Sequence, residues 1–243
     1  MSGTDQQTAP DWRAEVDQWW AEVLHVPVAA LRSGGLFTLD HVDHVGILAV
    51  DRSDAQIIYG PGWALPASTA ILRAGPVDLS EGQHLAATLG PRARRFLGPA
   101  WYGYVTEQTL GPLPGSEVRQ LGESDLPLLA RLRDRAPPAE REESGTTDLP
   151  AYGYLSEGEL LAVACLGTWH DMPTIGVLTD PRARGRGLAC MVVTAAAREG
   201  LNRRAVVQYR AWHRNTASIR VASRCGFVRY CDSLVIELEP RSS

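Results

Sequence analysis

Residues 174–200 constrain the fold most, because they read as a strand, a tight turn and a helix in direct succession. The strand is expected to end at Pro181, since proline cannot donate a hydrogen bond to a neighbouring strand. Apolar side chains then recur at helical spacing from 188 to 196. Gly200 follows the last of them and is expected to end the helix.

The turn between this strand and this helix has the chemistry of an anion site. The start of a helix leaves backbone N–H groups unpaired and carries a partial positive charge. Gly185 and Gly187 let an anion approach the backbone closely, while Arg182, Arg184 and Arg186 add positive charge. The turn has neither the Gly-Lys-Ser/Thr of a P-loop nor the GxGxxG of a dinucleotide site. We therefore expect it to cradle a diphosphate.

Two blocks of sequence carry a resemblance to a known family. The first block, Asp180-Pro181-x-x-Arg184-Gly185-x-Gly187-x-Ala189, resembles the acyl-CoA signature of the GNAT superfamily of N-acyltransferases. The second block, from Asn215 to Phe227, is similar to the Asn-x-x-Ser/Ala…Gly-Phe segment of that family. The resemblance covers residues 117–238. It implies a GNAT fold of the α+β class, with a mixed central sheet flanked by helices.

The best boundary lies at residues 111–116, where two prolines and two glycines occur within six positions. Residues 1–115 are predicted to form an additional N-terminal α+β region, which could be a degenerate acyltransferase half. Residues 116–240 are predicted to form the GNAT N-acetyltransferase domain.

Within the N-terminal region, an apolar stripe predicts a helix over 12–24. Short helices are expected over 69–73 and 82–89, and a strand pair over 96–100 and 102–105. His41 and His44 lie three residues apart, but the segment is more typical of a loop, and no metal site is expected.

Within the C-terminal region, residues 152–156 and 159–166 are expected to form a hairpin across Glu157-Gly158. A strand over 204–210 and a helix from 215 to 224 should follow. Two further strands, at 228–230 and 233–238, should complete the sheet.

The family resemblance implies acetyl-CoA as the cofactor. The strand before the turn would pair with the pantetheine arm, the turn would hold the diphosphate, and the second block would contact the pantetheine amide. The cofactor-binding residues implied in this way are Val177, Leu178, Thr179, Arg182, Arg184, Gly185, Arg186, Gly187, Leu188, Ala189, Asn215 and Ser218.

The catalytic acid departs from the family pattern. Many members carry a tyrosine four residues before the glycine of Gly-Phe, and this chain has Ala222 there. Ser218, one helical turn earlier on the same face, and Tyr209, on the preceding strand, are the candidates to protonate the leaving thiolate, with bulk water as a third route. The base remains open among Glu142, Glu143, His170 and Asp171 acting through water. His170 is the first to test, because histidine titrates near neutral pH.

The predicted reaction is direct transfer of an acetyl group to a primary amine of a small molecule. Glu142, Glu143 and Asp148 would attract a cationic acceptor, for example an amino-sugar antibiotic, a polyamine or an amino acid. An amino-sugar antibiotic as acceptor would indicate a function in antibiotic resistance. The alternative reading is that these carboxylates form a solvated loop. Two further hypotheses stay open: acetylation of proteins or peptides, and a non-catalytic acyl-CoA-binding module.

Composition bounds the remaining partners. All 24 basic residues are arginine, and ten of them lie between Pro181 and Arg224 with a single acid, Glu199. A polyanionic cofactor explains this cluster more economically than nucleic acid, so no nucleic-acid partner is expected. No apolar run reaches the length of a membrane span, and the first residues do not resemble a secretory signal. Four scattered cysteines read as reduced thiols. We expect a cytoplasmic monomer or homodimer.

Overall fold

The computed structural model describes residues 11–40, 46–52, 55–66, 89–112 and 117–239. Among these residues, no helix is long and apolar enough to cross a lipid bilayer. His41, His44 and the expected short helix at 69–73 lie outside the described part, as does all but the last residue of the one expected at 82–89.

In the part of the chain that the structure describes, the α-helices are α1 (Trp12–Val23), α2 (Val28–Arg32), α5 (Leu126–Arg135), α6 (Pro138–Glu143), α7 (Leu188–Leu201) and α8 (Thr216–Arg224). The strands are β1 (Gly35–Asp40), β2 (Gly46–Asp51), β3 (Ala55–Gly60), β4 (Ala93–Val105), β5 (Val118–Leu121), β6 (Ala151–Ser156), β7 (Glu159–Trp169), β8 (Met172–Thr179), β9 (Val207–Trp212) and β10 (Val228–Leu238).

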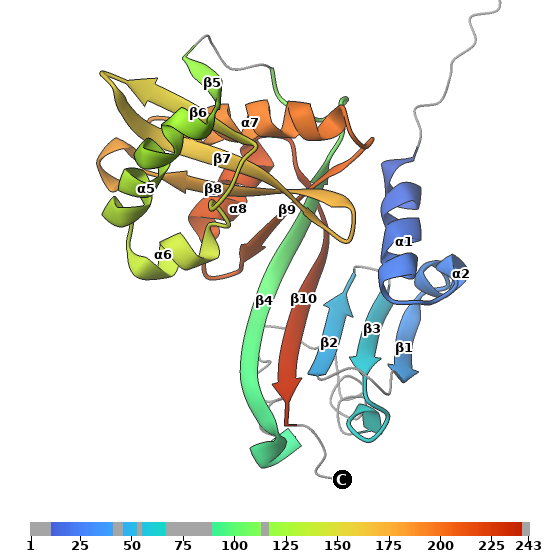
Figure 1. The fold of residues 1–243 in the computed structure, drawn as a ribbon. Coiled ribbons are helices and arrows are strands. Elements are labelled where there is room, and N and C mark those ends of the chain that lie inside the picture. Colours follow the sequence, from blue (N-terminus) through green and yellow to red (C-terminus); the bar gives the residue numbers. More distant parts are fainter. Residues whose placement is uncertain (1–10, 41–45, 53–54, 67–88, 113–116, 240–243) are drawn as a thin grey trace, which may run out of the picture.

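These strands form one sheet in the order β1-β3-β2-β10-β4-β9-β8-β7-β6-β5 (Figure 1). The β1–β3 and β8–β9 pairs are parallel, whereas the other described pairs are antiparallel. A mixed sheet flanked by helices confirms the predicted fold class.

Strand β4 precedes the expected boundary at 115/116, yet it lies inside the sheet, between β9 and β10. It pairs with β9 from Ala100 to Val105 and with β10 over most of its length. Figure 1 shows β4 and β10 running side by side between the two ends of the sheet. The sheet is therefore continuous across the expected boundary, of which residues 113–116 lie outside the described part.

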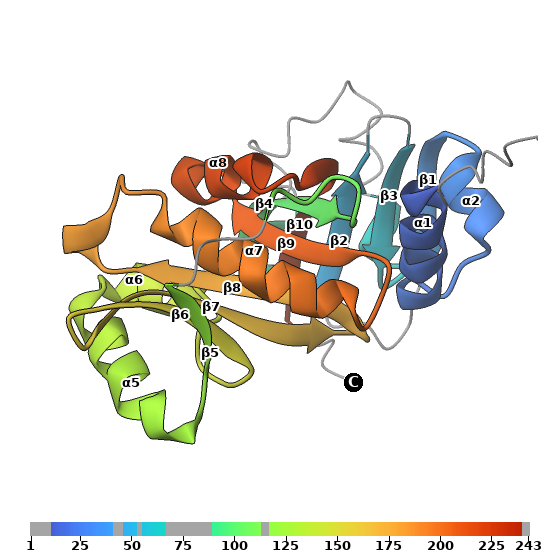
Figure 2. The same cartoon turned by 90° about the horizontal axis from the view of Figure 1, so that it is seen from above.

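Helices cover both faces of this sheet. Trp101 belongs to the apolar cluster under α7 and α8, while its neighbour Tyr102 belongs to the cluster that contains Trp20 of α1. Because successive side chains of a strand point to opposite faces, α1 lies on the face opposite α7 and α8. By the same alternation on β7, Val163 packs in the cluster with α5 and Ala164 packs in the cluster with α7. Figure 2 shows α5 and α7 on opposite sides of the sheet.

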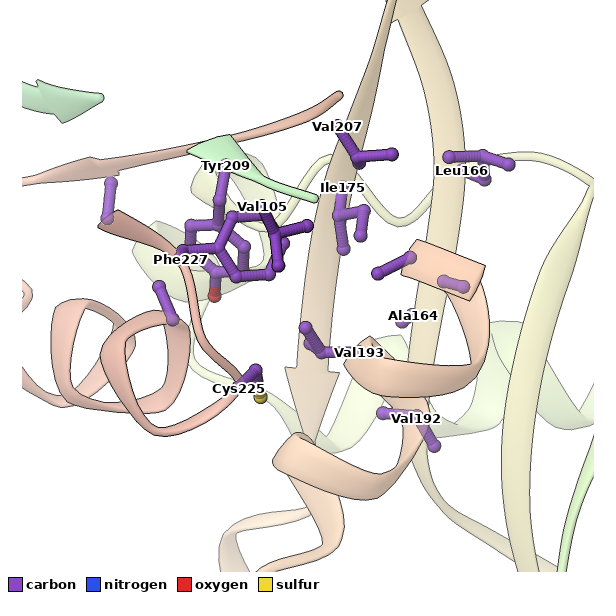
Figure 3. Close-up of a cluster of buried hydrophobic side chains, with 14 of the residues drawn as sticks. Val105, Ala164, Leu166, Ile175, Val192, Val193, Val207, Tyr209, Cys225 and Phe227 are labelled. Carbon is purple, nitrogen blue, oxygen red and sulfur yellow. The ribbon is translucent and has the colours of Figure 1, made fainter. Parts of the chain in front are cut away.

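The core beneath α7 fixes the helix against the strands that bound the site. Val192 and Val193 of α7 are fully buried against the side of the sheet that carries Ile175 and Val207 (Figure 3). The expected apolar stripe of this helix therefore faces the sheet, and its first turn is held rigidly at the end of β8.

Four sequence expectations are corrected. β4 is one strand where two were expected, and so is β10. Register shifts between β4 and β10, for example between Arg229 and Cys231, interrupt the alternation of apolar and polar residues by which a strand is recognised in sequence. The strand expected over 204–210 corresponds to β9, which begins three residues later than expected, at Val207. Gly200 does not end α7. A Cβ there would lie 2.6 Å from the Val207 side chain, so this glycine allows close packing of the helix on β9.

Candidate active site

The site begins where the parallel strands β8 and β9 separate. They are paired at only two positions, Thr174 with Gln208 and Ile175 with Tyr209. Beyond Ile175, β8 pairs with β7 alone, and beyond Tyr209, β9 pairs with β4 alone. The facing edges of the two strands therefore present backbone N–H and C=O groups that no neighbouring strand satisfies.

A cavity of about 1230 Å³ opens along this separation. One end is lined by the last residues of β8, the following turn, the first turn of α7 and one side of α8. The other end is lined by the end of α6, the end of β7 and the outer half of β9, residues 210–212. We call these the cofactor end and the acceptor end.

At the cofactor end, the turn has the geometry of an anion cradle. Gly185 and Gly187 both have positive φ, 77° and 80°, a conformation that glycine adopts without strain. Gly187 is the N-cap of α7. Within the described residues, no backbone hydrogen bond is recorded from the amides of 185–189, so these donors are open to a ligand.

Asp180 braces this turn, a contribution that the sequence pattern did not reveal. Its side chain is fully buried and accepts hydrogen bonds from the backbone and guanidinium of Arg182 and, at 2.6 Å, from Arg135 of α5. The Arg182 hydrogen bonds, reinforced by Arg135, hold the pKa of Asp180 well below its usual range. The carboxylate is therefore charged at neutral pH and ties α5 to the turn.

The arginines of the turn have different surroundings. Arg184 lines the cavity and is paired with Glu140 of α6. Arg182 does not line it, because its guanidinium is occupied by Asp180 and Glu159. Arg186 is exposed and also lies outside the cavity lining. The other residues implied for the cofactor, in the list that follows, all line the cavity: Val177, Leu178, Thr179, Gly185, Gly187, Leu188, Ala189, Asn215 and Ser218.

The two candidate acids meet in the middle of the cavity. Tyr209 Oη lies 2.8 Å from Ser218 Oγ, and both residues line the cavity. Asn215 caps α8 by accepting from the Ser218 amide at 3.0 Å, which fixes the serine at the start of the helix. Burial raises the pKa of Tyr209 well above its ordinary value, so its hydroxyl stays protonated. Ala222 is fully buried in the core and does not line the cavity.

The acceptor end is assembled from distant segments. The backbone of Ser144 and Gly145 passes directly over Gly176 of β8, so closely that a Cβ at 176 would clash with both. Trp169, at the end of β7, forms one wall and packs edge-on against Trp19 and Trp20 of α1, with ring centroids 5.3 and 5.9 Å away. The N-terminal region thus supports the wall of this end.

Of the carboxylates expected at the acceptor, Glu143 lines the cavity and forms an ion pair with Arg214. Glu142 and Asp148 are exposed and lie outside the lining. His170 also lies outside it: this residue stacks edge-on against Trp169, and its carbonyl accepts a hydrogen bond from the indole of Trp19. Of the expected carboxylates and His170, only Glu143 therefore reaches the cavity.

The four cysteines are free thiols. Cys190, in the first turn of α7, lines the cavity, and its Sγ lies 2.7 Å from that of Cys225. A hydrogen bond from the Cys225 thiol lowers the pKa of Cys190, and burial, which outweighs a backbone hydrogen bond at Asp148, raises the pKa of Cys165 to about 11. Among the described residues, no group of three or more potential metal ligands comes together.

The geometry can be compared with known proteins. Residues 156–228 match the family model of the GNAT acetyltransferase domain. A GCN5-related N-acetyltransferase from Kribbella flavida shares 15% identity over 96% of this chain and 97% of its own, with a TM-score of 0.51. A GNAT-family acetyltransferase from Novosphingobium aromaticivorans shares 21% identity over 61% of this chain and 68% of its own, with a TM-score of 0.48.

An aminoglycoside N-acetyltransferase in complex with CoA shares 26% identity over 46% of this chain and 90% of its own, with a TM-score of 0.37. A search of curated protein sequences finds no match. The family model spans β7, β8, α7, β9 and α8, which are the elements around the strand separation and the anion-binding turn. Residues 156–228 therefore match a GNAT acetyltransferase domain in sequence, and the chain shares the overall fold of the Kribbella flavida protein.

Proposed function

We propose that this protein is an acetyl-CoA-dependent N-acetyltransferase that acetylates a primary amine of a small molecule. One observation carries the proposal: the separation of β8 from β9 leads directly into a helix start with unpaired amides. An extended amide-containing arm that ends in a diphosphate matches this succession of donors and acceptors.

The residues present fit coenzyme A. The open edge of β8 from Val177 to Thr179 offers backbone partners for the pantetheine arm, and the amides of 185–189 offer donors for the diphosphate. Arg220 and Arg224 of α8 also line the cavity, and within the described residues neither guanidinium makes a recorded ion pair. These two positive charges suit the remaining phosphate of the cofactor. When bound, acetyl-CoA would supply an acetyl group activated as a thioester.

The chain itself would orient and polarise that group. Successive amides of a strand point to opposite neighbours, so of Val177 and Leu178 one donates towards β7 and the other towards the opening. A donor fixed in this position stabilises negative charge that develops on a carbonyl oxygen. The rigid packing of α7 under β8 keeps the donor in place.

Tyr209 and Ser218 would deliver the proton. Because burial raises the pKa of Tyr209, its hydroxyl holds a proton at neutral pH. Ser218 Oγ, 2.8 Å away and facing the cavity, can accept that proton while donating its own towards a leaving thiolate, and the proton lost by the attacking amine then returns through water to Tyr209. This pair takes over the function that the family assigns to the position of Ala222.

The proposal is tested by incubating the full chain with acetyl-CoA and panels of small amines, peptides and proteins. Acetylated products are identified by mass spectrometry, and CoA release is measured in parallel. We expect turnover with small primary amines. Turnover confined to peptides or proteins would replace the acceptor class, and CoA binding without turnover on any amine would contradict the proposed activity.

A further inference from the structure

The charge of the cavity is not what a cationic acceptor requires. Its lining contains two glutamates and five arginines. Both glutamates are already paired, Glu140 with Arg184 and Glu143 with Arg214. Three lining arginines, at 210, 220 and 224, make no recorded ion pair with a described carboxylate. The cavity therefore carries excess positive charge.

Arg210 is separated from the arginines that suit the cofactor phosphates. Tyr209 belongs to the core beneath α7 and α8, the helices of the cofactor end. Side chains alternate along a strand, so Arg210 projects from the opposite face of β9. Gln208, two residues earlier on that same face, donates to Tyr104 in the layer under α1. Arg210 is thus an exposed, unpaired cation at the acceptor end.

The surroundings of Arg210 favour a planar anionic group. Its guanidinium lies 5.7 Å from the centroid of the Trp212 ring, and that of Arg214 lies 5.4 Å from the same ring. Stacking on an aromatic ring orients a guanidinium while leaving its N–H donors free. Arg214 is neutralised by Glu143, so a single net positive charge remains beside Trp212. One guanidinium matches the single charge and the two oxygens of a carboxylate better than a doubly charged phosphate.

We propose that the amine acceptor carries a carboxylate, as an amino acid or a similar amino acid-like compound does, and that Arg210 binds this carboxylate beside Trp212. This inference rests on the proposed acetyltransferase function and names its substrate class. Arg210 is a specificity-determining residue in this scheme. Polyamines and amino sugars carry ammonium groups and no carboxylate, so the Arg210 guanidinium repels them.

The test uses pairs of amines that differ only in the carboxylate, such as lysine and cadaverine or histidine and histamine, together with the corresponding amino acid amides. Phosphoethanolamine distinguishes a phosphate from a carboxylate. We expect kcat/KM to be about 10- to 100-fold higher for the carboxylate member, the range for hydrogen bonds to a charged group. Arg210→Gln should remove this preference by raising KM with little change in kcat, and Arg210→Lys should restore part of it.

Arg203→Gln is the matched control, because it removes the same charge outside the cavity lining. The dissociation constant of CoA is measured for every variant and should not change. Equal turnover of both members of each pair, or preference for phosphoethanolamine, would overturn the inference and leave the proposed function intact.

If no amine is acetylated, the proposed function fails, and binding decides the inference separately. Calorimetric titration of N-acetylated amino acids into the CoA-saturated chain should then show binding that Arg210→Gln weakens at least about tenfold. Absence of binding, or equal binding of the matching N-acetylated amines without a carboxylate, would overturn it.

Discussion

The two ends of the cavity are built in different ways. The cofactor end is mostly one continuous stretch of chain, residues 177–190, closed on one side by α8. The acceptor end brings together the end of α6, Trp169, Gly176 and the outer half of β9, with α1 behind the tryptophan. A stretch of local sequence can dictate the first end, whereas the second exists only after distant elements pack.

The two ends also differ in the interactions that stabilise them. The cofactor end is held by the hydrogen bonds of a buried carboxylate and by the start of a helix. The acceptor end depends on close packing of Ser144 and Gly145 on Gly176, which a single methyl group would disturb. Substitutions should therefore affect one end without the other, and four of them test the separation.

Gly187→Val should have the largest effect. A side chain at this N-cap would project into the anion cradle, and we expect CoA affinity to fall more than about 100-fold through loss of two or more hydrogen bonds to a charged group. Gly158→Val is the control, because Gly158 has a similar φ of 77°, equally open surroundings and no place in the cavity. Equal loss of CoA affinity in both variants, measured by calorimetry, would refute the cradle.

Asp180→Asn should weaken the brace of the cofactor end. Breaking a buried ion pair, here with partly exposed arginines, should cost about 2–3 kcal/mol of unfolding free energy, and CoA affinity should fall about tenfold with the loss of anchoring hydrogen bonds. Asp125→Asn is the control, because Asp125 is similarly held by Arg119 but lies away from the cavity. It should lose stability and keep CoA affinity.

The same carboxylate sets a pH dependence. Because its pKa is lower in the folded chain than in the unfolded chain, Asp180 stabilises the fold fully above about pH 4, the unfolded value. This contribution is lost progressively as the pH falls below that value. Urea titrations from pH 7 down to pH 3 should therefore show the difference between wild type and Asp180→Asn shrinking with acidification. A difference that stays constant to pH 3 would argue that Asp180 is not charged in the folded chain.

Gly176→Ala should act at the acceptor end. The added methyl group pushes against Ser144 and Gly145, and the acceptor KM should rise about tenfold, in line with the cost of overpacking. CoA affinity should change little, because the turn at 185–189 is not displaced. Gly167→Ala, at a lining glycine whose Cβ would meet its nearest neighbour at 3.8 Å, should leave KM nearly unchanged. A drop in CoA affinity in Gly176→Ala would show that the two ends are coupled.

Ser218→Ala should have the smallest effect, because Tyr209 keeps its proton and a water molecule can replace the hydroxyl. We expect kcat to fall about tenfold, less than the full contribution of a general acid, with CoA affinity unchanged. Ser223→Ala is the control, since Ser223 lies on the same helix but donates to the Ile219 carbonyl. Unchanged kcat in rapid-quench measurements would remove Ser218 from the reaction.

The contrast between the two ends explains what the sequence could predict. The strand, the Gly185–Gly187 turn and the helix after it follow from local patterns, and so does Asn215 as a helix cap. The mixed sheet and the GNAT domain followed from the two motif blocks. These features depend on neighbours in sequence, which periodicity and capping rules describe.

The acceptor end had no such local signal. Arg210 is one of 24 arginines, and only its place beyond the last β8–β9 pair brings it into the cavity. Gly176 and Trp169 look like ordinary strand residues until the segment after α6 and helix α1 pack against them. Carboxylates near each other in sequence, such as Glu142 and Glu143, differ in whether they face the cavity, and this depends on the orientation of α6.

The position of β4 has a consequence for biosynthesis. A ribosome makes β4 more than a hundred residues before its two partners, β9 and β10, whose residues begin at 207 and 228. During that interval both long edges of the strand have no permanent partner. Assembly of the sheet around β4 must therefore wait until residues 207–238 have emerged, and a fragment that starts at residue 116 would lack the strand that lies between β9 and β10.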